Sequence, residues 1–314
     1  MAGRLTAVTG ASGFLGRHIV SALGARGDRV RILLRNPGVC PPWEGADPEI
    51  IQGDLAPASL RKLVAGADTV IHCAGLISAR SFSEFDEVNH WGAEAVAQAV
   101  LSAAPRARFI LISSLAAREP GLSDYALTKR SGESKVRALL SEDRTLVVRP
   151  PAIYGPGDRA TLPLFRMAAK RPIQLMIRPK GSRLALIHVE DAAAAIADLA
   201  RSDVTGTVTL GGDRPEGYEW RELVLALAEV YGRRSPRLVR VPAPVIRAAG
   251  AVTGFVASLI RRPAVFSPGK ARELLHPDWS VSAREMGPVP QPVSHPLREG
   301  LAQTAAWYRE QGWL

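Results

Sequence analysis

A glycine-rich turn between a strand and a helix constrains the fold of this chain more than any other feature. Leu5–Val8 is short and apolar, Gly13–Arg26 has a helical pattern, and the glycines at 10, 13 and 16 lie between and within them. Gly10 permits a tight turn, Gly13 lets backbone approach a pyrophosphate, and Gly16 lets the helix pack closely on the sheet. The turn predicts a dinucleotide site at the helix N-terminus, formed by Gly10, Ser12, Gly13, Phe14, Leu15 and Gly16.

Short apolar runs alternate with helical stretches through the first 150 residues. Each run is apolar throughout, as in a parallel sheet that helices cover on both faces. The alternation predicts an α/β fold with a Rossmann-type, doubly wound parallel sheet. The further strands expected are Arg29–Leu34, Ile50–Gln52, Thr69–His72, Phe109–Ile112 and Thr145–Arg149, and the further helices are Pro57–Ala65, Phe85–Ala103 and Tyr125–Leu140.

The pattern changes after Pro150, where prolines and glycines cluster. We therefore predict an NAD(P)-binding Rossmann domain over 1–150 and a smaller C-terminal substrate-binding lobe over 151–314. Two further strand–helix units, Ala185–Val189 with Asp191–Arg201 and Gly206–Leu210 with Tyr218–Tyr231, follow the turn region. We expect residues 185–210 to supply the last strands of the sheet, so that the lobe is interleaved with the first domain.

The charge balance leaves two interpretations open. The chain has 40 basic and 30 acidic residues, a formal net charge of +10. The excess arises either from solvated arginines or from attraction to an anionic surface such as phospholipid or a phosphorylated ligand. Basic and aromatic residues do not interleave as in nucleic-acid-binding proteins, so we expect no nucleic-acid partner.

The cysteines and the N-terminus bear on the compartment. Cys40 and Cys73 are too few for a disulfide framework and lack metal-ligand spacing, so we expect no metal site. The first strand begins almost at the N-terminus and leaves no room for a signal peptide. Together these features favour a cytoplasmic protein.

The end of the second strand bears on the choice of cofactor. Where an acidic residue would bind the ribose 2′-hydroxyl of NAD, this chain has Arg35, which can pair with a 2′-phosphate. We therefore expect NADP(H) in preference to NAD(H). After the third and fourth strands, Asp54 and Leu55 fit the adenine edge, and Cys73, Ala74 and Gly75 fit beneath the dinucleotide. Both groups also fit ordinary turns.

A serine, a tyrosine and a lysine form the expected catalytic group. Ser113 and Ser114 end the fifth strand at the carboxyl edge of the sheet, where such folds bind ligands. Tyr125 and Lys129 share one helix face because they are four residues apart. We expect the Lys129 ammonium to lower the pKa of Tyr125 from about 10. Tyr125 could then donate a proton to a carbonyl oxygen that Ser114 positions.

These pieces together resemble the extended short-chain dehydrogenase/reductase superfamily. The resemblance runs in order through Gly10–Gly16, Gly53-Asp54-Leu55, Asp68–Gly75, Asn89–Gly92, Ser113-Ser114, Tyr125–Lys129, Arg149–Gly157 and His188–Asp191. It implies that Lys129 binds the nicotinamide ribose and that Asn89 is a structural or proton-relay helper. It further implies that Pro150 borders the cofactor and that the substrate is lined by Ser114, Ala152, Ile153 and Tyr154. We expect His188 to be structural, because a lone histidine after a strand is more often a satisfied buried residue. Members often dimerise through the helices that here carry Asn89 and Tyr125, which implies a homodimer.

The chain also departs from part of that superfamily. Epimerases of sugar nucleotides usually keep an acidic residue at the position of Arg35, and Arg35-Asn36-Pro37 is more similar to ketone reductases such as the dihydroflavonol reductases. The chain, including Pro263–Ser267 and His276–Trp279, is similar to a bacterial branch related to the dinucleotide-binding accessory subunit of respiratory complex I. That branch includes reductases of oxidised (3-keto) ceramide.

Residues 243–262 form an apolar stretch that ends in Arg261 and Arg262. Pro244, Arg247 and two glycines argue against a transmembrane helix. Three interpretations remain: a buried helix of the lobe, the wall of an apolar pocket, or an interfacial helix that contacts anionic lipid at the membrane periphery. The last two are compatible with each other, and both indicate a lipid-like substrate.

We therefore expect an NADPH-dependent carbonyl reductase of a large apolar ketone, with 3-ketoceramide as the most specific expectation. One alternative is a nucleotide-sugar epimerase or dehydratase, in which Arg159, Arg166 and Arg183 would face a diphosphate. Another is a non-catalytic NADP-binding assembly subunit, which would not need Ser114, Tyr125 and Lys129 together.

Overall fold

A seven-stranded parallel sheet organises the N-terminal part of the computed structural model, which describes residues 3–39, 43–171, 173–233, 235–264, 266–288, 291 and 293–314. Cys40 lies outside these residues. The strand order is β11-β6-β5-β4-β1-β2-β3 and every neighbouring pair is parallel. The fold prediction is therefore confirmed. The strands are β1 (Leu5–Thr9), β2 (Arg29–Leu34), β3 (Glu49–Gln52), β4 (Thr69–His72), β5 (Arg108–Ile112), β6 (Thr145–Arg149) and β11 (Gly206–Thr209).

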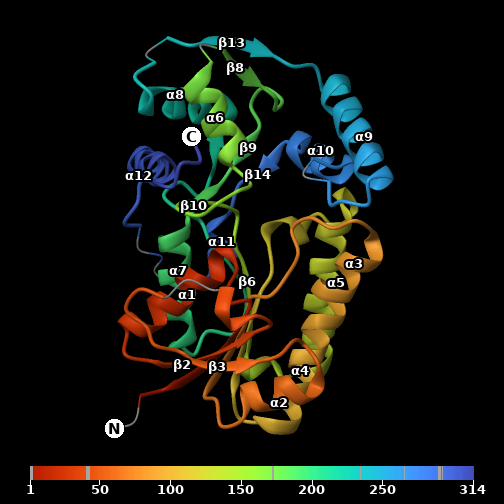
Figure 1. Ribbon diagram of the computed structural model, residues 1–314, viewed down its shortest axis with the longest axis vertical. Coiled ribbons are helices and arrows are strands. Elements are labelled where there is room, and N and C mark those ends of the chain that lie inside the picture. The colour runs from red at the N-terminus through yellow and green to blue at the C-terminus, as the bar shows by residue number, and fades with distance from the viewer. Residues whose placement is uncertain are drawn as a thin grey trace.

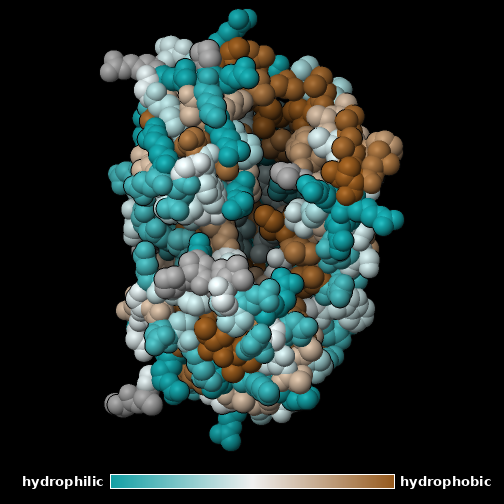
Figure 2. Space-filling model, in the orientation of Figure 1, coloured by the Kyte–Doolittle hydropathy of each residue, from teal (hydrophilic) through white to brown (hydrophobic). Residues whose placement is uncertain are grey.

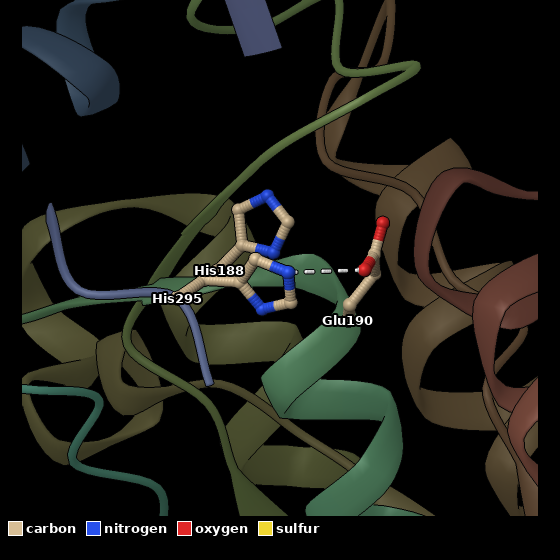
Figure 3. A group of neighbouring side chains, drawn as sticks. All are labelled: His188, Glu190 and His295. Carbon is tan, nitrogen blue, oxygen red and sulfur yellow. Dashed lines mark ion pairs between the residues drawn. The ribbon is translucent and has the colours of Figure 1, made fainter. Parts of the chain in front are cut away.

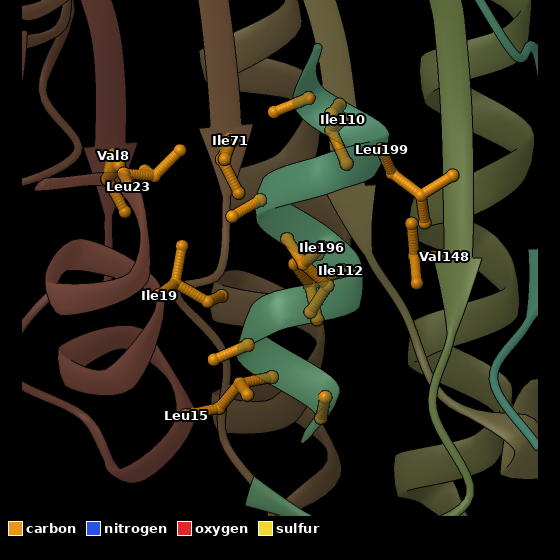
Figure 4. Packing of buried hydrophobic residues seen from close by; sticks show 14 of the residues in the cluster. Val8, Leu15, Ile19, Leu23, Ile71, Ile110, Ile112, Val148, Ile196 and Leu199 are labelled. Carbon is orange, nitrogen blue, oxygen red and sulfur yellow. The ribbon is translucent and has the colours of Figure 1, made fainter. Parts of the chain in front are cut away.

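Helices cover both faces of this sheet (Figure 1). Helices α1 (Phe14–Ala25) and α7 (Val189–Ala200) pack on one face, and α2 (Pro57–Val64), α4 (Gly92–Ala103) and α5 (Asp124–Leu139) on the other. Successive residues of β1 alternate between the two cores, since Ala7 belongs to one and Val8 to the other. Burial on both faces explains why the strands are apolar throughout. Figure 4 shows Leu15, Ile19 and Leu23 of α1 packed beside the sheet in the same core.

The expected helix Phe85–Ala103 is interrupted in the structure. It consists of α3 (Phe82–Asp86), a π-helical turn over Glu87–Trp91, and α4. The π turn carries Asn89, and α5 crosses it closely: a Cβ on Gly132 would lie 2.5 Å from the carbonyl oxygen of Asn89. Sequence periodicity misses such a turn because one additional residue hardly changes the apolar pattern. Wide turns of this kind often mark functional sites.

The described residues of the C-terminal lobe form three small sheets and several helices. β7 (Ala152–Tyr154) pairs with β10 (Leu186–His188), β8 (Ile173–Met176) with β13 (Arg237–Arg240), and β9 (Arg183–Leu184) with both β12 (Tyr218–Glu219) and β14 (Asp278–Trp279). The helices are α6 (Leu162–Lys170), α8 (Trp220–Val230), α9 (Ala243–Leu259), α10 (Pro268–Leu275), α11 (Ala283–Met286) and α12 (Leu297–Glu310). Phe165, Trp220 and Tyr308 anchor the core of this lobe.

Residues 185–210 return to the large sheet through β11 alone. We expected two strands there, but β10 pairs with β7 in a separate sheet. Pro150 and Pro151 explain the difference, because neither has the backbone N–H needed to continue the ladder from β6. The chain bends away at these prolines, and β10 follows it. The carboxyl ends of the strands consequently face the lobe (Figure 1).

The apolar stretch at 243–262 forms α9 on the outside of the lobe. Only Ile246 and Gly250 of this helix are buried, so the interpretation as a buried helix is wrong. The reason is that α9 packs through one face alone, against α10; a Cβ on Gly250 would lie 2.9 Å from the Cβ of Ala271. Among the described residues, no helix combines the length and apolarity needed to cross a membrane.

The close crossing of α5 over the π turn gives the first prediction. Gly132→Ala places a methyl group against the backbone of Asn89, which cannot move independently. We expect a loss of roughly 1–3 kcal/mol in the free energy of unfolding, the usual cost of overpacking. Urea denaturation measures this value. Gly121→Ala is the control, because a Cβ there meets nothing within 4 Å; equal stability of the two variants would contradict the prediction.

Candidate active site

The glycine-rich turn forms an open cradle at the carboxyl end of β1. Gly10 has a φ of +73°, and a Cβ on it would lie 2.5 Å from the backbone nitrogen of Ala74. A Cβ on Gly16 would lie 2.0 Å from the carbonyl oxygen of Gly10. Among the described residues, a Cβ on Gly13 would approach only the Gly10 carbonyl oxygen, at 3.2 Å, and Ser12 is exposed. Two glycines therefore make the turn compact, while the third leaves its outer side open.

The first turn of α1 leaves this cradle suited to an anion. Gly13 is the N-cap residue and no side chain caps the helix or places a carboxylate in its first turn. The N–H groups and the positive end of the helix dipole thus face the open side. Phe14 is half-buried, whereas Leu15 is buried in the core and can contribute only backbone. The cradle fits a dinucleotide pyrophosphate.

The floor of the site is the segment that follows β4. The Ala74 N–H donates to the Thr9 hydroxyl at 3.3 Å, which holds the segment against β1. Burial raises the pKa of the Cys73 thiol to about 11, so this side chain is a neutral, inert group. A Cβ on Gly75 would lie 3.0 Å from the Lys129 ammonium nitrogen. The floor therefore connects the cradle to the expected catalytic residues.

The adenosine end of the site is formed by the ends of β2 and β3. The Gly53 N–H donates to the Leu34 carbonyl at 2.9 Å, which brings Arg35 and Asp54 to neighbouring strand ends. Both side chains are exposed, and an Asp54 carboxylate oxygen accepts from the Ala56 N–H at 3.0 Å. Leu55 packs against Gly92. Contact of these residues with a cofactor stays a prediction.

Ser114, Tyr125 and Lys129 lie together at the end of β5. The Ser114 hydroxyl accepts from the Ala116 N–H at 3.1 Å, and the Ser123 hydroxyl caps α5 by accepting from the Ala126 N–H at 3.0 Å. This cap places Tyr125 in the first turn of α5. One turn later, the buried Lys129 donates to the Ile112 carbonyl at 2.9 Å, which anchors it to the end of β5.

The surroundings of Tyr125 correct one expectation. Burial raises its pKa to about 12, while hydrogen bonding with Ser114 acts in the opposite direction. We expected Lys129 to lower this pKa. Desolvation of the phenolate, aided by the charge of Glu273, instead outweighs the lowering by Ser114. Tyr125 is therefore a phenol at neutral pH, the form that can donate a proton. Burial also lowers the pKa of Lys129.

Asn89 connects three parts of the site. Its side-chain oxygen accepts from the Leu76 N–H at 2.9 Å, and its amide nitrogen donates to the Leu76 carbonyl at 3.1 Å and to the Thr128 hydroxyl at 3.2 Å. The amide thus holds the loop after β4 against α5, next to Lys129. These contacts fit the structural part of the role expected for Asn89.

A buried ion pair behind the site was not anticipated from the sequence. Glu133 is fully buried and accepts from the Ser113 hydroxyl at 2.6 Å and from the Arg149 guanidinium at 2.8 Å. It thereby joins the ends of β5 and β6 to α5. The sequence did hold one sign of this pair: Glu133 comes four residues after Lys129 and therefore lies on the same helix face.

The segment after Pro150 lies partly in the core. The Pro150 carbonyl accepts from the Leu115 N–H at 2.8 Å, which holds the segment beside Ser114. Ala152 is exposed and Ile153 is half-buried. Tyr154 is buried, with its ring edge-on to His188 at a centroid distance of 5.4 Å. Substrate contact by Ala152, Ile153 and Tyr154 stays a prediction.

A second cluster, His188, Glu190 and His295, lies at the start of α7 (Figure 3). The two imidazole rings stack with centroids 4.2 Å apart. Both nitrogens of His295 face carboxylates, Nδ1 at 3.0 Å from Asp191 and Nε2 at 3.2 Å from Glu190. Stacked rings direct their nitrogens along parallel planes rather than to one point. The arrangement therefore favours a His188 ring that stacks on the carboxylate-paired His295 over a metal centre.

Comparison with known proteins identifies the family of this chain. Residues 6–211 match the NAD dependent epimerase/dehydratase family, and the chain belongs to that family. With its Rossmann sheet and nicotinamide-dinucleotide cradle, it is an NAD(P)-dependent oxidoreductase of the extended short-chain dehydrogenase/reductase type.

Two relatives and one structure extend the comparison. The chain is 49% identical to "Ceramide reductase" of Caulobacter vibrioides (strain NA1000 / CB15N), over 99% of this chain and 96% of that protein. It is 28% identical to the mitochondrial NADH dehydrogenase [ubiquinone] 1 alpha subcomplex subunit 9 of Arabidopsis thaliana, over 84% of this chain and 66% of that protein. The structure of MoeE5 in complex with UDP-glucose and NAD superposes with a TM-score of 0.72 at 21% identity, covering 98% and 99% of the two chains, which shows a shared fold.

Buried His72 beneath the site gives a prediction for acid stability. Burial, aided by the nearby Lys129 charge, lowers the pKa of His72 to about 3, against about 6.5 in an unfolded chain. Between these values only the unfolded state binds the proton, so stability falls as the pH decreases below 6.5. At pH 5 the loss from His72 is about 2 kcal/mol.

Urea denaturation between pH 7.5 and 5 measures this effect. His72→Gln should reduce the pH dependence, whereas the control His276→Gln leaves His72 and its contribution in place. An identical pH dependence in wild type and His72→Gln would refute the assignment. The wild type also contains His188, whose pKa burial lowers to about 3, so some dependence should remain in the variant.

Proposed function

We propose that this protein is an NADPH-dependent carbonyl reductase of a large apolar ketone, and that 3-ketoceramide or a similar keto-lipid is its substrate. The observation that carries the proposal is the position of the Tyr125 hydroxyl, which hydrogen-bonds with Ser114. Tyr125 is a phenol near neutral pH, beside Ser114 and at the carboxyl edge of the sheet. A protonated tyrosine there suits the reduction of a carbonyl group, which needs a proton at the oxygen.

Different residues of the chain have different roles in this reaction. The glycine-rich turn and the first turn of α1 would hold the dinucleotide, which supplies a hydride to the carbonyl carbon when bound. Ser114 hydrogen-bonds the carbonyl oxygen, and Tyr125 donates its phenolic proton to that oxygen. Lys129, held by the Ile112 carbonyl, lies close enough to the floor to bind the nicotinamide ribose. Asn89 acts as a positioning residue through its contacts with the loop after β4.

The lipid-like substrate is supported by the ceramide reductase of Caulobacter vibrioides, since the likeness covers the C-terminal lobe as well as the sheet. The arrangement of arginines also disfavours the sugar-nucleotide alternative. The Arg159 guanidinium lies over the Trp313 ring at 4.6 Å, Arg166 donates to the Trp313 carbonyl at 3.1 Å, and Arg183 pairs with Glu219. Each of the three is thus engaged by the protein itself.

The preference for NADPH is supported by Arg35. Its side chain is exposed at the end of β2, and among the described residues no carboxylate lies within ion-pair distance of it. An exposed, unneutralised guanidinium at this position suits a 2′-phosphate. Because Arg35 replaces the acidic residue that would accept from a 2′-hydroxyl, NADH would lose that contact.

Substitution of the proton donor tests the reaction. Tyr125→Phe removes only the hydroxyl, and we expect the kcat for reduction of 3-ketoceramide to fall roughly 10²–10⁴-fold. NADPH binding should change far less, because it depends mainly on the glycine-rich turn. Steady-state kinetics with detergent-dispersed 3-ketoceramide measures the effect, and Tyr231→Phe, at a half-exposed tyrosine of the lobe, is the matched control. Full activity of Tyr125→Phe would disprove the catalytic assignment, while conversion of UDP-glucose instead of the ketone would favour an epimerase.

Substitution of Arg35 tests the cofactor preference. We expect Arg35→Ser to raise the Kd for NADPH roughly 10–100-fold, because one charge-assisted contact is lost. The Kd for NADH should change little, since NADH has no 2′-phosphate. Fluorescence titration measures both constants, with Arg29→Ser, at the opposite end of β2, as the control. A wild-type protein that binds NADH as tightly as NADPH would rule out the preference.

A further inference from the structure

One face of α9 consists of large apolar side chains that are exposed. Val252 is 62% exposed, Phe255 65% and Leu259 67%. Val245, Val256 and Ile260 continue this surface, which we call the α9 face, at spacings of three, four and seven residues. The opposite side of the helix carries Ile246, Gly250 and Gly254 against α10. The helix is therefore amphipathic in an unusual sense, with its larger apolar residues directed outward.

The loop before α3 extends this apolar surface. Ile77 is 71% exposed and Phe82 47% exposed. Arg80 and Ser81, which lie between them in sequence, line a pocket together with Ala257, Ser258 and Arg261 from the end of α9. Figure 2 shows the apolar residues gathered over α9, at the border of a hollow between the lobe and the sheet domain. An apolar surface of this kind on a protein usually marks an interaction site.

The charge of the protein is concentrated in the same part of the chain. Residues 230–272 contain nine arginines and lysines and no aspartate or glutamate, whereas the other 31 basic and 30 acidic residues nearly cancel. Nearly all of the net charge of +10 therefore belongs to this segment. Within the described part of the chain, no carboxylate pairs with its exposed arginines Arg237, Arg240, Arg247, Arg261 and Arg262.

The end of α9 keeps two of these arginines beside the apolar face. Arg261 has a φ of +51°, a left-handed conformation that usually requires glycine. The Arg261 N–H donates to the Ser258 carbonyl at 3.2 Å and the Arg262 N–H to the Ala257 carbonyl at 3.0 Å, which closes the helix. A strained arginine where glycine would be relaxed suggests that its cationic side chain is needed there.

We propose that the α9 face, together with Ile77 and Phe82, binds the surface of an anionic phospholipid bilayer. The helix would lie in the plane of the interface, with its apolar side chains at the acyl boundary and Arg261 and Arg262 at the phosphates. The loop that carries Ile77 begins at Gly75, beside Lys129. Because this loop forms one side of the candidate active site, docking through the α9 face turns that side toward the membrane. An apolar ketone would be dissolved there.

Charge favours the bilayer over a second copy of this chain. In a symmetric dimer through the α9 face, the arginines at its rim would approach the same arginines of the partner, and like charges repel. An anionic bilayer instead offers opposite charge and an apolar interior to the same surface. The inference goes beyond the proposed reaction and does not depend on it, because membrane binding is measured without turnover.

Vesicle flotation of the full chain tests the proposal. We expect the wild type to float with vesicles of 60% phosphatidylcholine and 40% phosphatidylglycerol, and much less with phosphatidylcholine alone or at 1 M NaCl. Arg261→Glu/Arg262→Glu should weaken binding roughly 25-fold or more, at about fivefold for each charge removed. Phe255→Ser/Leu259→Ser should weaken it at least roughly tenfold, because two large apolar side chains no longer enter the interface.

Matched controls separate this surface from general effects of charge or apolarity. Arg106→Glu and Leu101→Ser change an exposed arginine and an exposed leucine near the start of β5, the end of that strand that faces away from the lobe. Both should bind vesicles like the wild type, and thermal melting and NADPH titration verify that every variant is folded. The proposal fails if wild type does not bind the anionic vesicles, or if the α9 variants bind them as the controls do. It also fails if light scattering shows a dimer that the α9 substitutions dissociate.

Discussion

The close approach of two backbones at Gly10 is the contact on which the candidate site depends. The turn after β1 lies so near the segment after β4 that a single methyl group at Gly10 would come within 2.5 Å of Ala74. This approach places the cradle and the floor side by side. Through Gly75 the same floor reaches Lys129, so one backbone contact fixes the distance between the glycine-rich turn and the proposed catalytic group. Rigid parallel strands behind the turn make that distance reproducible.

Desolvation then sets the chemistry. The residues that surround the floor are mostly buried, and burial drives each titratable group toward its neutral form. Tyr125 is held as a phenol, Cys73 as a thiol and His72 as a neutral imidazole. The site therefore offers neutral hydrogen-bonding groups, and the charge of Glu273 adds to burial in raising the pKa of Tyr125. Where a full charge is buried, as at Glu133, it is paired with Arg149 and hydrogen-bonded by Ser113.

The two halves of the molecule differ in where their apolar side chains lie. The sheet domain buries most of the isoleucines, leucines and valines of β1 to β6 in two cores, one on each face of the sheet. The lobe buries aromatic residues around Tyr308 but leaves the largest side chains of α9 outside. Because α9 exposes most of its large apolar residues, the lobe buries less apolar surface in its own core. The acid-free segment around α9 adds positive charge to that surface, which is what contact with an anionic bilayer requires.

Local patterns in the sequence determined the sheet, its helices, the glycine-rich turn and the trio of Ser114, Tyr125 and Lys129, since each depends on residues close together in the chain. Periodicity could not reveal the π turn at Asn89, because one extra residue in a helix leaves the apolar pattern almost unchanged. Nor could it show that β10 follows β7 away from the sheet, that Glu133 pairs with Arg149, or that burial outweighs the hydrogen bond with Ser114 in setting the pKa of Tyr125. Those outcomes depend on which distant segments meet and how much water they exclude. The same holds for α9, whose composition suited a core helix. The packing of α10 against the small residues of α9 decided that most of its large apolar residues face outward.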